Sequence, residues 1–130
     1  MNLNVHRFGS GTPSVLLLHG LSSAGPVWWR IAGALETSGY TSVAPDLRGH
    51  GQSEHPGEYY LERFARFVLG SCSGPWRLVI GHSLGCSVGV QVASMKPSFS
   101  DAYHLIDPAF TIDQITAEEI RSSIISAVAD

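Results

Sequence analysis

Short apolar runs of strand length recur along the chain. Runs at residues 14–19, 41–45, 77–80 and 102–106 are rich in β-favouring residues, and residues 3–8 form a similar segment before a Gly-Ser-Gly turn. The run at 14–19 is apolar almost throughout, as expected of a strand that is covered on both faces of a sheet. We therefore predict a strand at each of these places.

Helical periodicity fills the intervals between these runs. It predicts a helix within residues 26–39, a second that closes at Gly70, a third over 84–95, and a last helix that begins at Thr116 with Glu119 as its capping-box partner. The apolar faces are formed by Trp28, Ile31, Ala32 and Leu35 in the first, Tyr60, Phe64, Phe67 and Val68 in the second, and Ile120, Ile124 and Val128 in the last.

This alternation of strands and helices predicts an α/β fold. We expect a mostly parallel, twisted sheet of about five strands with helices on both faces. Ligands of such folds bind at the carboxyl ends of the strands. Polar segments follow the predicted strands at residues 19–21, 46–53 and 82–83, so these three segments are expected to share one edge of the sheet.

The segment Gly81-His82-Ser83-Leu84-Gly85 stands between a predicted strand and a predicted helix. A serine on such a sharp strand-to-helix turn is exposed as a nucleophile, and the tight bend requires small residues two positions away on either side. Ser83 would also lie at a helix N-terminus, where free N–H groups favour an oxyanion. Ser83 is therefore the candidate catalytic nucleophile.

A second glycine-containing turn follows the strand at 14–19. Gly20 lets the chain swing so that the N–H of Leu21 can face the serine turn, and the N–H of Leu84 points the same way. Two preorganised main-chain donors of this kind form an oxyanion hole. His19 is expected to hold this loop rather than to transfer protons.

The segment "APDLRGHGQSEHP" has no periodicity and is predicted to be a polar loop. Asp46 and Arg48 are expected to form a local ion pair or to bind backbone groups there. Neither is assigned a catalytic role.

Composition restricts the class of protein. Of the 130 residues 44% are hydrophobic and 15% are charged, which is typical of a chain that forms a globular core. The formal net charge of −3, without a run of Lys or Arg, argues against nucleic acid or an anionic membrane as partner. The longest strongly apolar run, residues 15–18, is too short to cross a bilayer.

The cysteines and the first residues bear on location and cofactors. The N-terminus lacks the basic start and apolar core of a secretory signal. Cys72 and Cys86 have no metal-ligand spacing, so they are expected to be reduced thiols in a cytoplasmic protein. Neither a metal site nor a phosphate-binding loop is predicted, and no cofactor is expected.

Three motifs together identify a resemblance. "LLLHGL", "VAPDLRGHGQS" and "LVIGHSLG", in this order, resemble the α/β-hydrolase fold superfamily and its branch of small-molecule esterases, lactonases and haloperoxidase-like enzymes. The resemblance extends over about residues 14–108. It implies Ser83 as nucleophile and Leu21 and Leu84 as oxyanion-hole donors. Cys86 departs from the glycine that is frequent in this branch, but it is small enough to pack, buried, against the strand.

The resemblance also implies a catalytic acid and then a histidine after the serine, the histidine following the last strand. Asp107 ends the strand at 102–106, where some members carry the acid, although a turn-capping role before Pro108 is the favoured interpretation. None of the six histidines occupies the position of the base. They are His6 in the first strand, His19 and His50 in loops before the serine, His55 in a polar loop, His82 beside the serine, and His104 within a strand.

The chain is thus expected to be the N-terminal part of a single hydrolase domain, residues 1–130, in which 112–130 begin a cap helix. The favoured function is a serine hydrolase of small esters, thioesters or lactones, whose histidine lies beyond residue 130. The alternative is a non-catalytic remnant that serves as a binding or assembly module. A parallel sheet with an open edge would also allow self-association.

Overall fold

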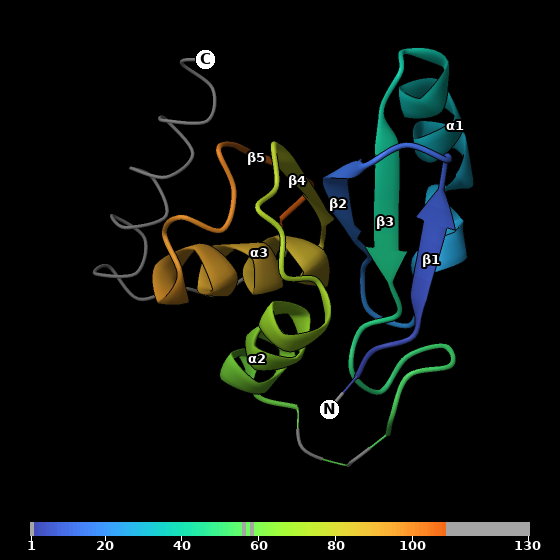
Figure 1. The fold of residues 1–130 in the computed structure, drawn as a ribbon. Coiled ribbons are helices and arrows are strands. Elements are labelled where there is room, and N and C mark those ends of the chain that lie inside the picture. The colour runs from blue at the N-terminus through green and yellow to red at the C-terminus, as the bar shows by residue number, and fades with distance from the viewer. Residues whose placement is uncertain (1, 56, 58, 109–130) are drawn as a thin grey trace.

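The computed structural model describes residues 2–55, 57 and 59–108, which form one sheet with helices on both faces (Figure 1). The strands have the spatial order β1-β3-β2-β4-β5, in which β1 is antiparallel to β3 and the other neighbours are parallel. This confirms the predicted mostly parallel α/β sheet. The strands are β1 (Val5–Phe8), β2 (Pro13–Leu18), β3 (Thr41–Pro45), β4 (Leu78–His82) and β5 (Tyr103–Ile106).

The helices lie in two layers. The 3-10 helix η1 (Gly25–Trp28) and α1 (Trp29–Thr37) cover one face of the sheet, and α2 (Leu61–Ser71) and α3 (Leu84–Met95) cover the other. Each strand-to-helix connection therefore places the next helix against the sheet, as the right-handed crossover of parallel strands requires.

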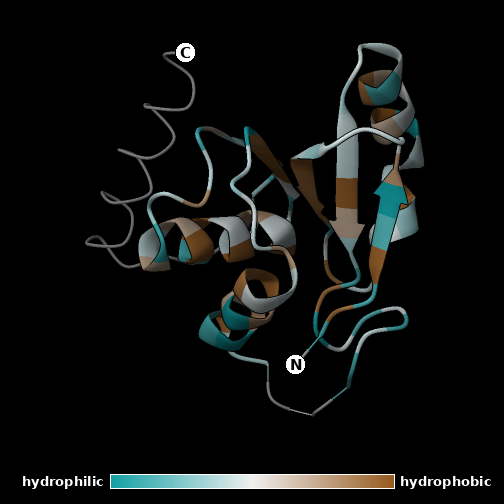
Figure 2. Cartoon of the chain, viewed as in Figure 1, coloured by the Kyte–Doolittle hydropathy of each residue, from teal (hydrophilic) through white to brown (hydrophobic). Residues whose placement is uncertain are grey.

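The central strand β2 supplies both layers of the core. Leu16 and Leu18 pack with side chains of α2 and α3, whereas Val15 and Leu17 pack with Trp28 and α1. All four β2 side chains are at most 2% exposed, and each such burial contributes about 1.5–3 kcal/mol to folding. Figure 2 shows the resulting contrast between the apolar β2 and β4 and the more polar outer strand β1.

Several element boundaries differ from the sequence-based predictions, those of β2, β4 and β5 by one or two residues. The first strand begins at Val5, because the N–H groups of Leu3 and Asn4 donate to the hydroxyls of Ser71 and Ser53 instead of extending the ladder. The first helical segment begins as a 3-10 turn, so Ile31 is 39% exposed although it was expected in the buried stripe. α2 continues one residue past Gly70. The helix predicted from Thr116 and the proposed cap at 112–130 lie outside the described residues.

Strands β2, β3, β4 and β5 are parallel and end at one edge of the sheet, which we call the carboxyl rim. The residues that directly follow these four strands are His19, Asp46, Ser83 and Asp107. The polar segments at residues 19–21, 46–53 and 82–83 therefore lie at one edge of the sheet, as expected.

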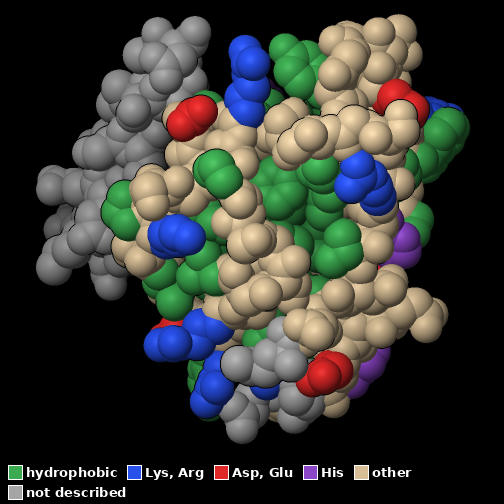
Figure 3. Space-filling view, in the orientation of Figure 1, with side chains coloured by type: hydrophobic (Ala, Val, Ile, Leu, Met, Phe, Trp, Pro, Cys, Tyr) green, Lys and Arg blue, Asp and Glu red, His purple; other side chains and the backbone are tan. Residues whose placement is uncertain are grey.

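The described part of the chain leaves β1 and β5 as the outermost strands of the sheet. Self-association through an open edge stays a prediction. In Figure 3 hydrophobic side chains occupy the middle of the visible face, and Lys and Arg side chains lie around them. None of the described helices combines the length and apolar character needed to span a membrane.

Candidate active site

Ser83 forms the turn between β4 and α3. Its backbone has φ 51° and ψ −113°, a conformation that non-glycine residues rarely adopt. Such a residue costs about 1–3 kcal/mol of strain, which the surrounding structure must offset. Two hydrogen bonds hold it: the N–H of Ser83 donates to the carbonyl of Ile106 at 3.1 Å, and the N–H of Cys86 donates to the carbonyl of Ser83 at 2.9 Å.

The glycines on either side of this turn are required by close backbone contacts. A Cβ at Gly85 would lie 2.0 Å from the carbonyl oxygen of Leu18 in β2, and a Cβ at Gly81 would lie 2.7 Å from the carbonyl oxygen of Gly85. Any side chain at Gly85 would therefore force α3 away from the central strand. These close backbone contacts agree with the expectation that the turn needs small residues.

The loop after β2 reaches the serine turn from the neighbouring strand. A Cβ at Gly20 would lie 3.3 Å from the Cβ of Ser83 and 3.0 Å from Nδ1 of His82. Gly20 to Ser23 form a turn closed by a hydrogen bond from the N–H of Ser23 to the carbonyl of Gly20 at 3.2 Å, with Ser22 at φ 61°. We call residues 20–23 the oxyanion turn, after the role predicted for it.

The amides of the two candidate donors are uncommitted. Among the described residues, the N–H groups of Leu21 and Leu84 are not donors in any of the backbone hydrogen bonds of loops, turns and caps. Leu84 is the first residue of α3, so its amide is one of those that a helix leaves without an internal acceptor. The side chain of Leu21 is 71% exposed beside them. Leu21 thus lies in the loop after β2, and Ser83 and Leu84 directly follow the adjacent strand β4.

His19 is completely buried behind the oxyanion turn. Its Nε2 lies 2.9 Å from the backbone N of Leu47 and its Nδ1 lies 2.7 Å from the carbonyl oxygen of Gly20. Burial lowers the pKa of His19 from its ordinary value of 6.5 to about 4. His19 is therefore neutral near pH 7 and bonded at both nitrogens, which agrees with the loop-holding role expected of it.

The carboxylate of Asp46, 1% exposed, joins segments from distant parts of the chain. It accepts hydrogen bonds from the N–H of Gly25 at 2.7 Å, the N–H of Gln52 at 3.0 Å and the side chain of Asn4 at 3.0 Å, and Nε2 of His6 lies 2.9 Å away. Burial alone would raise the pKa of Asp46, but these bonds lower it to about 2. The predicted backbone-binding role of Asp46 is confirmed.

Arg48 differs from the expectation of a local pair with Asp46. Its guanidinium carbon lies 4.5 Å from the centre of the Phe67 ring, while the carboxylate of Asp46 takes the partners named above. The side chain of Arg48 is therefore directed toward α2, since stacking on an aromatic face suits a buried guanidinium.

The buried His19 makes stability depend on pH in a defined window. The unfolded chain binds a proton at His19 with pKa near 6.5 and the folded chain only near 4, so the unfolded state holds more protons between these values. The free energy of unfolding should fall as pH decreases from 6.5 to 4, by about 3 kcal/mol from this group. Urea unfolding at pH 6.5 and at pH 4 measures this difference in the free energy of unfolding. His19→Gln should show a correspondingly smaller dependence, and an unchanged dependence in that variant would contradict the assignment.

The remaining histidines and Cys86 differ in burial and in their contacts. The ring of His50 lies 5.1 Å from that of His19, and His55 and His104 are exposed. The thiol of Cys86 is buried with the carbonyl oxygens of Gly81 and Ile106 both within reach of its single S–H, and burial raises its pKa. This agrees with the expectation that Cys86 is small enough to pack, buried, against the strand.

Asp107 directly follows β5, the strand next to the serine turn. β4 and β5 pair with His82 opposite Ile106, so Asp107 follows directly at the position beside Ser83. It is exposed and has φ 49°. Its place on the carboxyl rim is compatible with a catalytic acid, and its backbone conformation is compatible with a turn residue, so both interpretations stay open.

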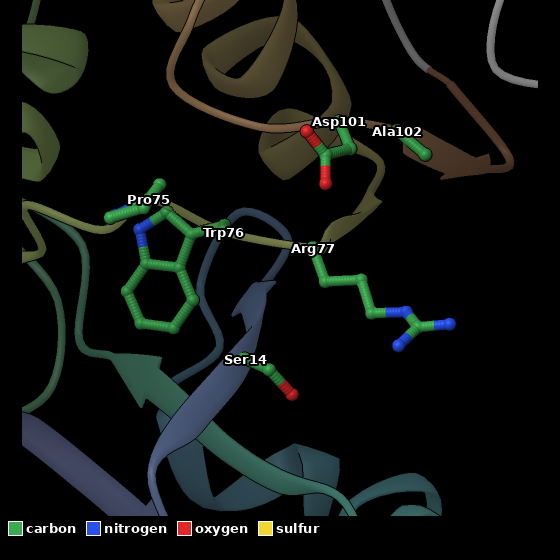
Figure 4. Close-up of a pocket in the computed structure, with 6 residues that line it drawn as sticks. All are labelled: Ser14, Pro75, Trp76, Arg77, Asp101 and Ala102. Carbon is green, nitrogen blue, oxygen red and sulfur yellow. The ribbon is translucent and has the colours of Figure 1, made fainter.

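A cavity of about 520 Å³ lies elsewhere on the molecule (Figure 4). Ser14 at the start of β2, Arg77 just before β4 and Ala102 just before β5 line it, together with Pro75, Trp76 and Asp101. These residues mark the amino ends of the strands, opposite to the carboxyl rim. The cavity is therefore not part of the site around Ser83. No group of three or more His, Cys, Asp or Glu in the described parts of the chain could hold a metal ion.

Comparison with known proteins agrees with this geometry. The family model described as "alpha/beta hydrolase fold" matches residues 13–121, most of the chain. The chain belongs to the alpha/beta hydrolase fold family. It is similar to the Mycobacterium tuberculosis protein named lipase LipV, with 31% identity over 98% of this chain and 49% of that protein. An epoxide hydrolase of Caballeronia sordidicola is 29% identical over 95% of the chain and 40% of its own length.

Solved hydrolase structures show the same arrangement. A thermophilic esterase from Thermogutta terrifontis matches with a TM-score of 0.74 and 29% identity, over 92% of this chain and 45% of that one. The thioesterase domain from the curacin biosynthetic pathway matches with a TM-score of 0.72 and 27% identity, over 96% and 49%. The chain thus spans about half the length, or less, of the curated relatives it matches, several of which are named as hydrolytic enzymes.

Sequence reasoning missed the contribution of the N-terminal segment to the rim. The sequence analysis assigns His6 only to the first strand, yet Nε2 of His6 lies 2.9 Å from the carboxylate of Asp46, and the side chain of Asn4 binds the same carboxylate. The antiparallel pairing of β1 with β3 brings them there. A single sequence carries no signal for this pairing beyond the strand pattern itself.

Proposed function

We propose that this protein is a serine hydrolase in which Ser83 is the nucleophile and the N–H groups of Leu21 and Leu84 form the oxyanion hole. The single observation that supports it most is the backbone of Ser83, held at φ 51° between a buried strand and a helix. Strain of this kind persists where a side chain must be presented in one direction.

In the proposed reaction the Ser83 oxygen attacks an acyl carbon and its proton passes to a histidine beyond residue 130. The carbonyl oxygen becomes an oxyanion that accepts hydrogen bonds from Leu21 and Leu84. When this intermediate collapses, the alcohol or thiol departs with the proton that the histidine had accepted. An acyl-serine remains. Water then hydrolyses the acyl-serine by the same steps. The sequence of bonds formed and broken requires no metal or cofactor.

The substrate class follows from this chemistry. Small esters, thioesters and lactones all present an acyl carbon with an oxygen or sulfur leaving group. Relatives named as a lipase, a thioesterase domain and an esterase support this class. The two free cysteines are both buried, which is compatible with the cytoplasmic location that we propose.

The partial coverage of the relatives favours a second candidate function. Because the chain spans about half of its relatives, it could also fold as a non-catalytic module that keeps the sheet and the serine turn without turnover. The two functions differ in whether the Ser83 hydroxyl is activated.

Labelling by a fluorophosphonate probe, followed by intact mass measurement, separates them. The protein made from its complete reading frame should gain one probe, Ser83→Ala should gain none, and the control Ser98→Ala, an exposed serine in the connection between α3 and β5, should react like wild type. A folded wild-type protein that stays unlabelled would contradict the hydrolase and favour the module.

A further inference from the structure

The hydrogen-bond partners of the two ring nitrogens of His19 are compatible with only one neutral tautomer. A backbone amide can only donate, so Nε2 must be the unprotonated acceptor of the N–H of Leu47 at 2.9 Å. A carbonyl can only accept, so Nδ1 must carry the proton that bonds to the carbonyl of Gly20 at 2.7 Å. A single neutral form therefore satisfies both contacts, and this buried ring is fixed in orientation.

The bond from His19 acts on the peptide that carries a proposed oxyanion-hole donor. The carbonyl of Gly20 and the N–H of Leu21 belong to one peptide unit, and in a trans peptide they point in opposite directions. The same carbonyl also accepts the N–H of Ser23 at 3.2 Å, so both of its lone-pair directions have donors. With the carbonyl held toward the interior, the N–H of Leu21 is directed away from it.

The other end of this loop is held from the same strand terminus. Asp46 accepts the N–H of Gly25 at 2.7 Å, and Leu47, the next residue, donates to His19. The end of β3 therefore fixes residues 20–25 at both ends, although the loop leaves β2 and the proposed nucleophile stands on β4. Neither side chain faces the solvent, since His19 is 0% and Asp46 1% exposed.

We propose that His19 is a positioning residue whose Nδ1–H fixes the Gly20–Leu21 peptide so that the amide of Leu21 is presented to the oxyanion formed at Ser83. This inference rests on the proposed hydrolase function and adds to it the element that holds one donor of the oxyanion hole. His19 acts through the peptide and does not touch the substrate.

Two substitutions divide the contacts of His19. His19→Asn places an amide N–H near the position of Nδ1 and keeps the donor to Gly20, whereas His19→Gln places its amide near Nε2 and keeps the contact with Leu47. At a temperature where circular dichroism shows both folded, His19→Gln should lower kcat on an ester by about 100-fold with KM nearly unchanged, and His19→Asn should stay within about tenfold of wild type. Equal losses in the two variants would overturn the proposal.

Two measurements do not depend on turnover. In a proton–nitrogen correlation spectrum, the amide signals of Leu21 and Ser23 should shift in His19→Gln and stay near their wild-type positions in His19→Asn. In wild-type protein at neutral pH, the nitrogen shifts of His19 should identify the Nδ1–H tautomer, and the opposite tautomer would overturn the proposal even if neither variant folds. If these results are obtained but wild type neither labels nor turns over, the hydrolase function fails while the orienting contact of His19 stands.

Discussion

Replacing Gly85 by alanine is expected to destabilise the protein by about 3 kcal/mol or more, because the added methyl group has no space. Its Cβ would lie 2.0 Å from the carbonyl oxygen of Leu18 and 2.8 Å from that of His19. Both are backbone atoms of the central strand and its exit, so no side chain can rotate to make room. α3 would have to move off β2, which disrupts the layer that α2 and α3 form with the sheet.

Gly89 in the same helix is the matched control. The three atoms nearest to a Cβ there are side-chain atoms of Leu18, Tyr103 and Val79, at 3.8–3.9 Å, which is ordinary contact. Gly89→Ala should leave stability unchanged or raise it by up to about 1 kcal/mol, because alanine favours helix over glycine. Urea unfolding followed by circular dichroism compares the two. If Gly85→Ala were as stable as Gly89→Ala, the close approach of α3 to β2 would be wrong.

Substitution of Ser83 is expected to have the largest effect on activity. In the protein made from its complete reading frame, Ser83→Ala and Ser83→Gly should each lower kcat for ester hydrolysis by about a million-fold, because no nucleophile remains. Ser83→Gly should also raise the free energy of unfolding by about 1 kcal/mol, since glycine adopts φ 51° without the strain carried by serine.

Ser94, an exposed residue near the end of α3, provides the control. Ser94→Ala should keep wild-type kcat. Initial rates and urea unfolding on the same preparations give both quantities for each variant. Stabilisation without loss of activity in Ser83→Gly would mean that the strained residue is not the nucleophile.

The sequence predicted the α/β architecture well because its two periodicities are local. The unbroken apolar run in β2 follows from burial on both faces, and the structure shows Leu16 and Leu17 packing into opposite layers. The glycines around Ser83 were likewise predictable, since a tight turn restricts residue size within five positions. Gly81 depends on a neighbour in the chain, since a Cβ there would meet the carbonyl of Gly85, but the closest contact at Gly85 is with the carbonyl of the distant Leu18 in β2.

The interactions that hold the rim in place were less predictable because they join distant residues. Asp46 binds Asn4, His6 and Gly25, which lie 21 to 42 positions away in the sequence. A polar loop with an aspartate admits many partners, and only the strand order β1-β3-β2 selects these. His19 could be interpreted as a loop-holding residue, but its acceptor contact with Leu47 depends on the same strand order.

The most direct test is a crystal structure of the protein after reaction with a fluorophosphonate. We expect the phosphorus on the oxygen of Ser83 and one phosphonyl oxygen about 3 Å from the backbone nitrogens of both Leu21 and Leu84. An adduct on another side chain, or a phosphonyl oxygen turned to solvent away from these two nitrogens, would contradict the account.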